Sequence, residues 1–286
     1  MEYTFPVKNS QMQRYELHSC KKGLLLFLIL SFKILLFSSK SGLMNLIIDT
    51  GNTRTKLALF QGREMLAFSN FEGVDDKHII QFCESNPVIK NAILSSVRQY
   101  PSEIDTYLTQ RYYTVLFNQN TAVPIINKYC TPETLGKDRL AGVVGAQKII
   151  PASDILVIDA GTAITYDFIT ASGEYLGGSI SPGIAMRYKA LHTYTDRLPL
   201  LNYYDDTQLI GDDTSTSIYS GVLNGALSEM EGIIQQYRNI YPGLKIIITG
   251  GDHNYFDKRL KIKTFAAPNL VLEGLNLILD FNIETH

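Results

Sequence analysis

The chain has 286 residues, enough for two domains of ordinary size, each with its own core. Its composition, 45% hydrophobic and 19% charged, excludes an intrinsically disordered protein, and a net charge of −2 without a basic stripe gives no reason to expect a nucleic-acid partner. The three cysteines are widely spaced and the histidines are scattered, so we expect neither a disulfide framework nor a zinc site. The same pattern predicts a reducing, cytoplasmic setting.

The N-terminal segment differs from the rest of the chain in charge and hydropathy. Two lysines precede an interrupted apolar run over residues 23–37. That run is too short and too interrupted for a convincing membrane-spanning helix, and no clean cleavage site follows it. Because Met44 stands directly before the first predicted strand, we expect residues 1–43 to be an extension outside the fold. An over-extended start is favoured, a membrane anchor is the alternative, and a membrane partner is therefore not expected.

The first motif is LIIDTGNTRTK, which runs from Leu46 to Lys56. It predicts a buried strand that ends at Asp49, a tight turn at Gly51, and a polar strand that returns alongside. The backbone N–H groups and the threonine hydroxyl of such a turn suit phosphate oxygens, and the aspartate can hold Mg²⁺ directly or through water. A single Asp-x-Gly after a strand is also a common structural turn.

Strands and helices alternate after this motif. The predicted strands are 56–60, 64–70 and 91–97, with a turn at 61–63 between the first two, and the predicted helices are 77–83, 104–112 and 139–149. No linker rich in proline or glycine follows. We therefore place the domain boundary inside the last of these helices, which gives an N-terminal domain at 44–150 and a C-terminal domain at 151–286.

The sequence Gly136-Lys137-Asp138-Arg139 stands at the start of that last helix. A carboxylate in a first helical turn ordinarily caps the helix or complements its dipole. The functional alternative is a general base that takes the proton from an acceptor hydroxyl. Phosphoryl transfer needs mainly positioning and charge neutralisation, so Asp138 with Mg²⁺ and a cation such as Arg139 would suffice.

The second motif is LVIDAGTAITY, residues 156–166, and it repeats the first. Asp159, Gly161 and Thr162 match the aspartate, glycine and hydroxyl of the earlier copy. A hairpin again follows: the predicted strands are 164–169 and 175–180, with a turn at 172–173. The duplication is therefore architectural as well as local, and it favours a nucleotide clamp made of two facing copies over two unrelated turns.

The remaining third of the chain begins with a long amphipathic helix. Its apolar stripe is broad enough to meet a core or a partner subunit. The predicted elements are a helix at 217–239, a strand at 245–249 and a closing helix at 268–279. Glycine pairs at 177–178 and 250–251 would let backbone approach a ligand closely. The chain lacks both the P-loop and the Gly-x-Gly-x-x-Gly pattern, which argues against P-loop and Rossmann folds.

Taken together, these motifs resemble the type III pantothenate kinases of the actin, Hsp70 and sugar-kinase superfamily. The matching motifs are Asp49-x-Gly51-Asn52-Thr53, Gly136-x-Asp138-Arg139, Asp159-x-Gly161-Thr162-Ala163-x-Thr165, Gly177-Gly178-x-Ile180-x-Pro182-Gly183, Leu198-Pro199 and Gly250-Gly251-Asp252. The resemblance runs from Met44 to near the C-terminus, and Gly-x-Asp-Arg is its most specific part. It implies an α/β fold of two tandem actin-like (ribonuclease H-like) domains with an interdomain nucleotide cleft, assembled as a homodimer.

The same resemblance implies a reaction and site residues. The reaction is ATP-dependent phosphorylation of pantothenate to 4'-phosphopantothenate, the first step of coenzyme A biosynthesis. Asp138 would be the catalytic base, Asp49 would lie near Mg²⁺, and Asp159 would bind a monovalent cation, K⁺ or NH₄⁺. The implied ATP contacts are Asp49, Thr50, Gly51, Asn52, Thr53, Arg54, Thr55, Lys56 and Thr162. The implied pantothenate contacts are Tyr129, Gly136, Lys137, Asp138, Arg139 and Thr214, with Thr216 as the alternative to Thr214.

Two other functions stay open at this point. One is a kinase of another small hydroxyl acceptor, such as a sugar or acetate, on the same fold. The other is a nucleotide-binding regulatory protein that keeps the clamp without turnover, and the presence of Asp138 and Arg139 speaks against it. The residues alone reach only a two-domain ATP phosphotransferase, and the acceptor follows from the resemblance.

Overall fold

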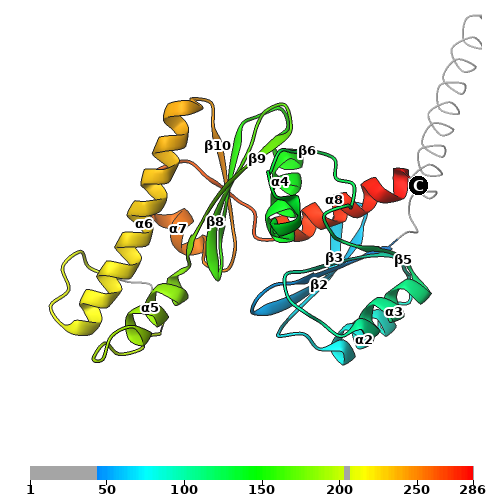
Figure 1. The fold of residues 1–286 in the computed structure, drawn as a ribbon, viewed down its shortest axis with the longest axis horizontal. Coiled ribbons are helices and arrows are strands. Elements are labelled where there is room, and N and C mark those ends of the chain that lie inside the picture. Colours follow the sequence, from blue (N-terminus) through cyan, green and yellow to red (C-terminus); the bar gives the residue numbers. More distant parts are fainter. Residues whose placement is uncertain (1–43, 203–206, 286) are drawn as a thin grey trace, which may run out of the picture. The chain divides into compact units, whose positions relative to one another are not determined.

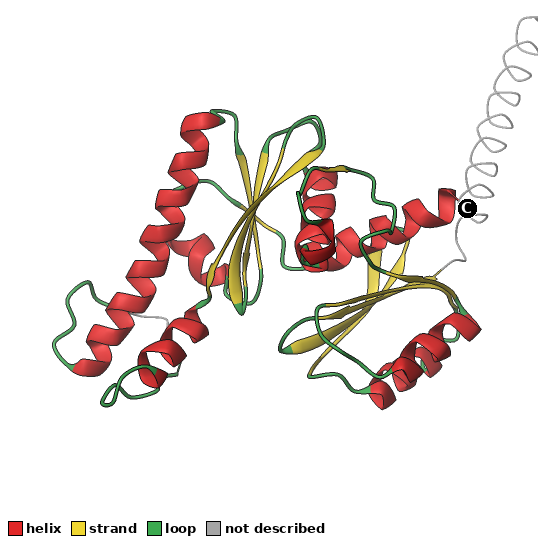
Figure 2. Ribbon diagram, viewed as in Figure 1, coloured by secondary structure: helices red, strands yellow, loops and turns green. Residues whose placement is uncertain are grey.

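The computed structural model describes residues 44–202 and 207–285. The N-terminal extension expected at 1–43 lies outside these residues. Figures 1 and 2 show two mixed β-sheets, each accompanied by its own helices. Within the two described ranges, no helix is long and apolar enough to cross a membrane.

The first sheet has the strand order β3-β2-β1-β4-β5. Its strands are β1 (Met44–Thr50), β2 (Arg54–Gln61), β3 (Glu64–Glu72), β4 (Ile89–Ser96) and β5 (Tyr113–Leu116). β1, β2 and β3 form an antiparallel meander, whereas β4 runs parallel to β1, and β5 runs parallel to β4. β1 is buried on both faces, and for that reason its sequence is a continuous apolar run rather than an alternation.

The second sheet repeats this arrangement. Its strands are β6 (Ile126–Asn127), β7 (Ile155–Ala160), β8 (Ala163–Ile169), β9 (Glu174–Pro182), β10 (Lys245–Thr249) and β11 (Phe265–Ala266). The order is β11-β10-β7-β8-β9-β6, in which β7, β8 and β9 are antiparallel and β10 and β11 run parallel to β7. Apart from β6, order and direction match those of the first sheet. The predicted duplication and fold class are confirmed.

Helices cover both faces of each sheet. They are α2 (Asp76–Glu84), α3 (Ser102–Arg111), α4 (Lys137–Ile149), α5 (Ile184–Thr193), α6 (Thr214–Ile240), α7 (His253–Arg259) and α8 (Leu270–Thr285), with a short 3₁₀ helix at Pro132–Thr134. One hydrophobic cluster joins α2 and α3 to the first sheet, and another joins α5, α6 and α7 to the second. A third cluster contains α4 and α8 together with residues of both sheets.

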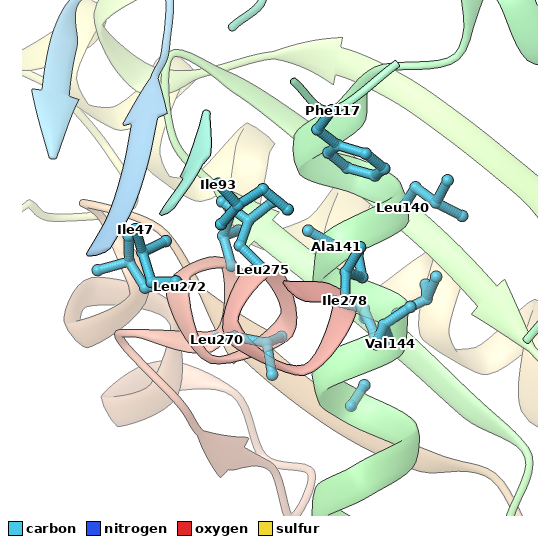
Figure 3. Packing of buried hydrophobic residues seen from close by; sticks show 14 of the residues in the cluster. Ile47, Ile93, Phe117, Leu140, Ala141, Val144, Leu270, Leu272, Leu275 and Ile278 are labelled. Atoms are coloured by element: carbon cyan, nitrogen blue, oxygen red, sulfur yellow. The ribbon is translucent and has the colours of Figure 1, made fainter. Parts of the chain in front are cut away.

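The shared cluster around α4 and α8 is drawn in Figure 3. Ile47 and Ile93 of the first sheet lie beside Leu272 and Leu275 of α8. Leu140, Ala141 and Val144 line the facing side of α4 in the same view. All of these side chains are at most 8% exposed, so the two helices form a common core for both halves of the fold.

Two elements cross the predicted domain limits. β6, from the first half of the chain, pairs with β9 of the second sheet. α8, from the end of the chain, packs on β1 and β4 of the first sheet. The limits 44–150 and 151–286 therefore stay a prediction. A movement of one half against the other would change the contacts of β6 with β9 or of α8 with the first sheet.

The predicted strands and helices occur with shifts of a few residues at their ends, apart from α8, which continues to Thr285 instead of ending at 279. α4 begins at Lys137 rather than at residue 139, so Asp138 lies inside its first turn. The short elements α5, α7, β5, β6 and β11 were not predicted. α7 and the three strands are too short to show a periodic pattern, whereas α5, at ten residues, is as long as the predicted α3, so its length does not explain why it was missed.

Candidate active site

The turns of the two repeated motifs lie against each other. The N–H of Gly51 donates to the carbonyl of Arg54 at 2.9 Å, and the N–H of Gly161 donates to the carbonyl of Ala163 at 3.0 Å, which closes each turn. The hydroxyl oxygens of Thr53 and Thr162 are 3.2 Å apart. Both threonines are exposed, so the turns present their hydroxyls and backbone to solvent at one shared place.

The motif aspartates occupy equivalent positions in the two sheets. Asp49, near the end of β1, is paired in register with Lys56 of β2. Asp159, near the end of β7, is paired with Thr165 of β8 and Thr249 of β10. Asp138, in the first turn of α4, lines a small cavity together with Asp159, and the charges of both residues act on Asp49.

Burial raises the pKa of all three carboxyls, and repulsion within the group adds to the shift of Asp49 and of Asp159. Burial raises the pKa of Asp49 to about 7, Lys56 opposes the shift, and the charges of Asp138 and Asp159 add to it. Burial and then the charge of Asp138 raise the pKa of Asp159 to about 6. Burial also raises the pKa of Asp138, against the opposing backbone N–H of Arg139, which donates to Asp138 Oδ1 at 2.9 Å.

This donor set fits a divalent cation that arrives with phosphate. Oxygen ligands are what Mg²⁺ prefers, and it usually takes one or two carboxylates together with water and substrate phosphates. In the described part of the chain, no three acidic, histidine or cysteine side chains lie close enough to enclose a metal by themselves. Asp49 is a carboxylate ligand of the kind that Mg²⁺ takes together with substrate phosphates.

We expect the ligand-free chain to lose stability as the pH rises. The folded state keeps protons on Asp49 and Asp159 up to pH values of about 7 and about 6, whereas the unfolded chain releases them near the ordinary aspartate pKa of 3.8. Between these limits the folded state binds more protons, so the free energy of unfolding falls with increasing pH. Urea denaturation at a series of pH values measures this slope.

The matched variants for that experiment are Asp49→Asn and Glu133→Gln. Asp49→Asn removes a buried carboxyl and should flatten the slope between pH 4 and about 7. Glu133 is exposed, and its substitution should leave the slope as in the parent chain. An unchanged slope in Asp49→Asn would show that the carboxyl of Asp49 does not hold its proton in the folded state.

A buried ion pair, Arg139 and Asp167, lines the same small cavity as Asp138 and Asp159. Arg139 Nε donates to Asp167 Oδ1 at 2.9 Å, and Nη2 lies 2.7 Å from the same oxygen. Tyr129 packs beside the pair: the Arg139 Cζ lies 5.7 Å from the centroid of its ring. Sequence reasoning missed Asp167. An acidic residue inside the otherwise apolar strand 164–169 was the available indication, because buried carboxylates need a partner.

The glycine pair after β10 reaches the second motif. Gly250 has φ of +91°, a conformation that residues with a side chain rarely adopt. A Cβ at this position would lie 2.4 Å from Asp159 Oδ1. The chain therefore passes close to the Asp159 carboxylate, and the approach of this backbone to a ligand stays a prediction.

Several other predicted residues have identifiable contacts. Thr55 is fully buried, and its hydroxyl donates to the carbonyl of Gly73 at 2.5 Å, so it serves the hairpin itself. Lys137 Nζ donates to the carbonyl of Ser96 at the end of β4, at 3.1 Å. Arg98, which was not predicted, donates to the carbonyl of Asn52 at 3.3 Å and thus places a cation beside the first turn.

Thr214 lies apart from the other predicted site residues. It lines an open pocket of about 620 Å³ with Leu191 and Leu198, and none of the residues 49–56, 136–139 or 159 lines this pocket. Thr216 is instead occupied as a helix cap, since its N–H donates to Asp213 Oδ1 at 2.7 Å and its hydroxyl accepts from the N–H of Asp213 at 3.0 Å. The Thr216 side chain is thus less suited to bind a ligand.

Comparisons with known proteins agree with the motifs. A family model described as type III pantothenate kinase matches residues 45–236. A type III pantothenate kinase from Christiangramia forsetii is 44% identical over 248 residues, which cover 84% of this chain and 99% of the relative. One from Phocaeicola vulgatus is 43% identical over 240 residues, with coverage of 84% and 99%.

Among solved structures, the chain is similar to a Campylobacter jejuni protein assigned to the Baf family of transcriptional activators. The TM-score is 0.55 and the sequence identity 22%, over 84% of this chain and 99% of that one. At that identity the likeness concerns the fold alone.

Proposed function

The chain belongs to the type III pantothenate kinase family, and from this premise we propose which of its residues transfer the γ-phosphoryl group of ATP to pantothenate. The enzyme is a phosphotransferase that uses ATP with Mg²⁺ and forms 4'-phosphopantothenate, in coenzyme A biosynthesis. One observation carries the assignment of roles: Asp138 and Asp159 line the same small cavity, and the charge of Asp138 raises the pKa of both Asp49 and Asp159.

ATP binds across the facing turns in this proposal. Backbone N–H groups and side chains of residues 50–56 and the hydroxyl of Thr162 contact the phosphates, and Asp49 holds Mg²⁺ directly or through water. The 3.2 Å distance between the Thr53 and Thr162 hydroxyls supports a single phosphate site formed by both motifs. Bound Mg²⁺ neutralises phosphate charge and would relieve the repulsion among the carboxylates.

Asp138 takes the proton of the acceptor hydroxyl. Its Oδ1 accepts the N–H of Arg139 at 2.9 Å, which fixes the carboxylate in the first turn of α4 and leaves Oδ2 for the substrate. Its raised pKa brings the carboxylate closer to the basicity that a general base needs near neutral pH. Tyr129, Gly136, Lys137 and Arg139 surround the pantothenate beside it.

We also propose a homodimer. Thr214 lines a pocket apart from Asp138, so its predicted contact with pantothenate would have to come from Thr214 of the partner subunit. The exposed apolar side chains near that pocket, among them Tyr194, Leu209 and Ile210, support an interface there. A cytoplasmic location is part of the same proposal, and it rests on the cysteine pattern.

Asp159 is proposed to hold the monovalent cation, and the test is the rate of ADP release by the full chain with MgATP. We expect ADP release to depend on pantothenate. We also expect it to be faster in K⁺ than in Na⁺, because a carboxylate that does not coordinate Mg²⁺ can select a larger cation by its oxygen geometry. Asp159→Asn should lose the difference between K⁺ and Na⁺.

The controls decide between the alternatives. Glu133→Gln should keep both the pantothenate response and the K⁺ response. ADP release that responds to a sugar or acetate but not to pantothenate would move the chain to another acceptor. Bound ATP without turnover on any acceptor would favour the regulatory protein.

A further inference from the structure

Asp167 is a fully buried carboxylate that none of the roles above uses. It lies in β8 with 1% of its surface exposed, and its partner Arg139 in α4 is 8% exposed. An isolated charge at such depth is costly, so both groups depend on their partners. Asp167 lies 28 residues from Arg139 in the sequence, and the pair ties α4 to the second sheet.

Both oxygens of Asp167 are engaged by side chains from different elements. Oδ1 faces Arg139 and accepts the hydroxyl of Tyr175, from β9, at 2.7 Å. Oδ2 accepts the hydroxyl of Thr165, on its own strand, at 2.9 Å. With its acceptors occupied from three directions, the carboxylate cannot rotate without breaking a charge-assisted hydrogen bond.

The same contacts extend to the acceptor site. The rings of Tyr129 and Tyr175 stack with centroids 6.1 Å apart and planes 16° apart, and Arg139 lies beside Tyr129. Arg139 also donates its backbone N–H to Asp138. Asp167 therefore contacts Tyr175, which stacks on Tyr129. It also contacts Arg139, whose backbone N–H binds Asp138.

We propose that Asp167 is the positioning residue of the acceptor site, which orients Arg139, Tyr129 and thereby Asp138 through its contacts with Arg139 and Tyr175. Its charge also compensates that of Arg139, so Arg139 acts on the acceptor as an oriented hydrogen-bond donor rather than as a net positive charge. The inference rests on the proposed function, because it presumes that the acceptor binds beside Asp138.

Tyr175→Phe tests the proposal without removing a charge. It deletes only the hydroxyl that donates to Asp167, and we expect kcat/KM for pantothenate to fall about tenfold while KM for MgATP stays unchanged. Tyr166→Phe is the matched control: Tyr166 is equally buried, on the adjacent strand, but belongs to the cluster on the opposite face of the sheet. It should leave both constants as in the parent chain.

A double-variant cycle separates positioning from a merely structural role. Asp167→Asn should lower kcat/KM for pantothenate about 100-fold, since small misplacements of reacting groups have effects of that size. If Asp167 acts through Arg139, adding Asp167→Asn to Arg139→Gln should cause little further loss, whereas independent effects would multiply. The Tyr175→Phe comparison remains informative if Asp167→Asn does not fold.

The outcomes separate this inference from the proposed function. A parent chain without pantothenate-dependent ADP release would contradict the proposed function. A parent chain that turns over, with Tyr175→Phe equal to Tyr166→Phe or with multiplying losses in the cycle, would overturn the positioning role alone. Selective loss toward pantothenate together with non-multiplying effects would establish it.

Discussion

Asp138→Asn is expected to lower the rate of pantothenate-dependent ADP release by about 10²- to 10⁴-fold, the usual contribution of a positioned general base. The amide has the shape of the carboxylate and can still accept the N–H of Arg139, but it cannot take the proton of the acceptor hydroxyl. The substitution should lower kcat. Steady-state kinetics with pantothenate and MgATP varied in turn will show whether kcat or a KM value changes.

The affinity of the Asp138→Asn variant for MgATP shows whether the loss concerns proton transfer or nucleotide binding. The charge of Asp138 raises the pKa of both Asp49 and Asp159, so its removal relieves repulsion where the metal and phosphates are proposed to bind. Affinity for MgATP should therefore not weaken. Glu133→Gln makes the same chemical change at an exposed site just before α4 and should leave turnover intact. Unchanged turnover in Asp138→Asn would rule out the general-base role.

Gly274→Ala is expected to destabilise the fold by about 3 kcal/mol or more, beyond the usual range for overpacking by one methyl group. A Cβ at Gly274 of α8 would lie 1.9 Å from the carbonyl oxygen of Ala141 in α4, and one at Gly145 would lie 2.7 Å from the carbonyl oxygen of Leu270. The two helix backbones are thus in direct contact, and a methyl group would force them apart in the core that both sheets share.

The matched control is Gly232→Ala in α6. A Cβ there meets nothing within 4 Å, and the position is exposed. The same substitution should therefore stabilise the chain by about 0.5–1 kcal/mol, the gain of alanine over glycine inside a helix. Urea denaturation of both variants measures the contrast. A Gly274→Ala variant as stable as Gly232→Ala would mean that α4 and α8 do not cross at these glycines.

Much of the fold could be predicted from local patterns. The two Asp-x-Gly hairpins, from β1 to β2 and from β7 to β8, followed from apolar runs, a turn glycine and hydroxyl residues within about ten positions of one another. Strand β10 occurs at 245–249 as predicted, because a short apolar run before a glycine pair is a local feature. The family also followed from such motifs.

Other features could not be predicted because no local pattern encodes them. Glycine inside a helix lowers its stability, and the reason for Gly274 became clear only from the contact between α8 and α4. Asp167 was not singled out in the sequence, and its importance became clear only from the contacts of Arg139 and Tyr175 with its carboxylate. Thr214 was the predicted substrate contact with Thr216 as the alternative, and only the structure shows that the Thr216 side chain is engaged in the cap of α6.

By itself, the sequence determined the longer strands, the hairpin turns, the duplication and the family, since each rests on residues close together in the chain. Only the tertiary structure decided that Asp49, Asp138 and Asp159 share one region, that Asp167 neutralises Arg139, and that α8 completes the core of the first sheet. The physical reason is that desolvation and charge–charge energies depend on distance and burial in space, whereas turn and helix propensities depend on neighbours along the chain.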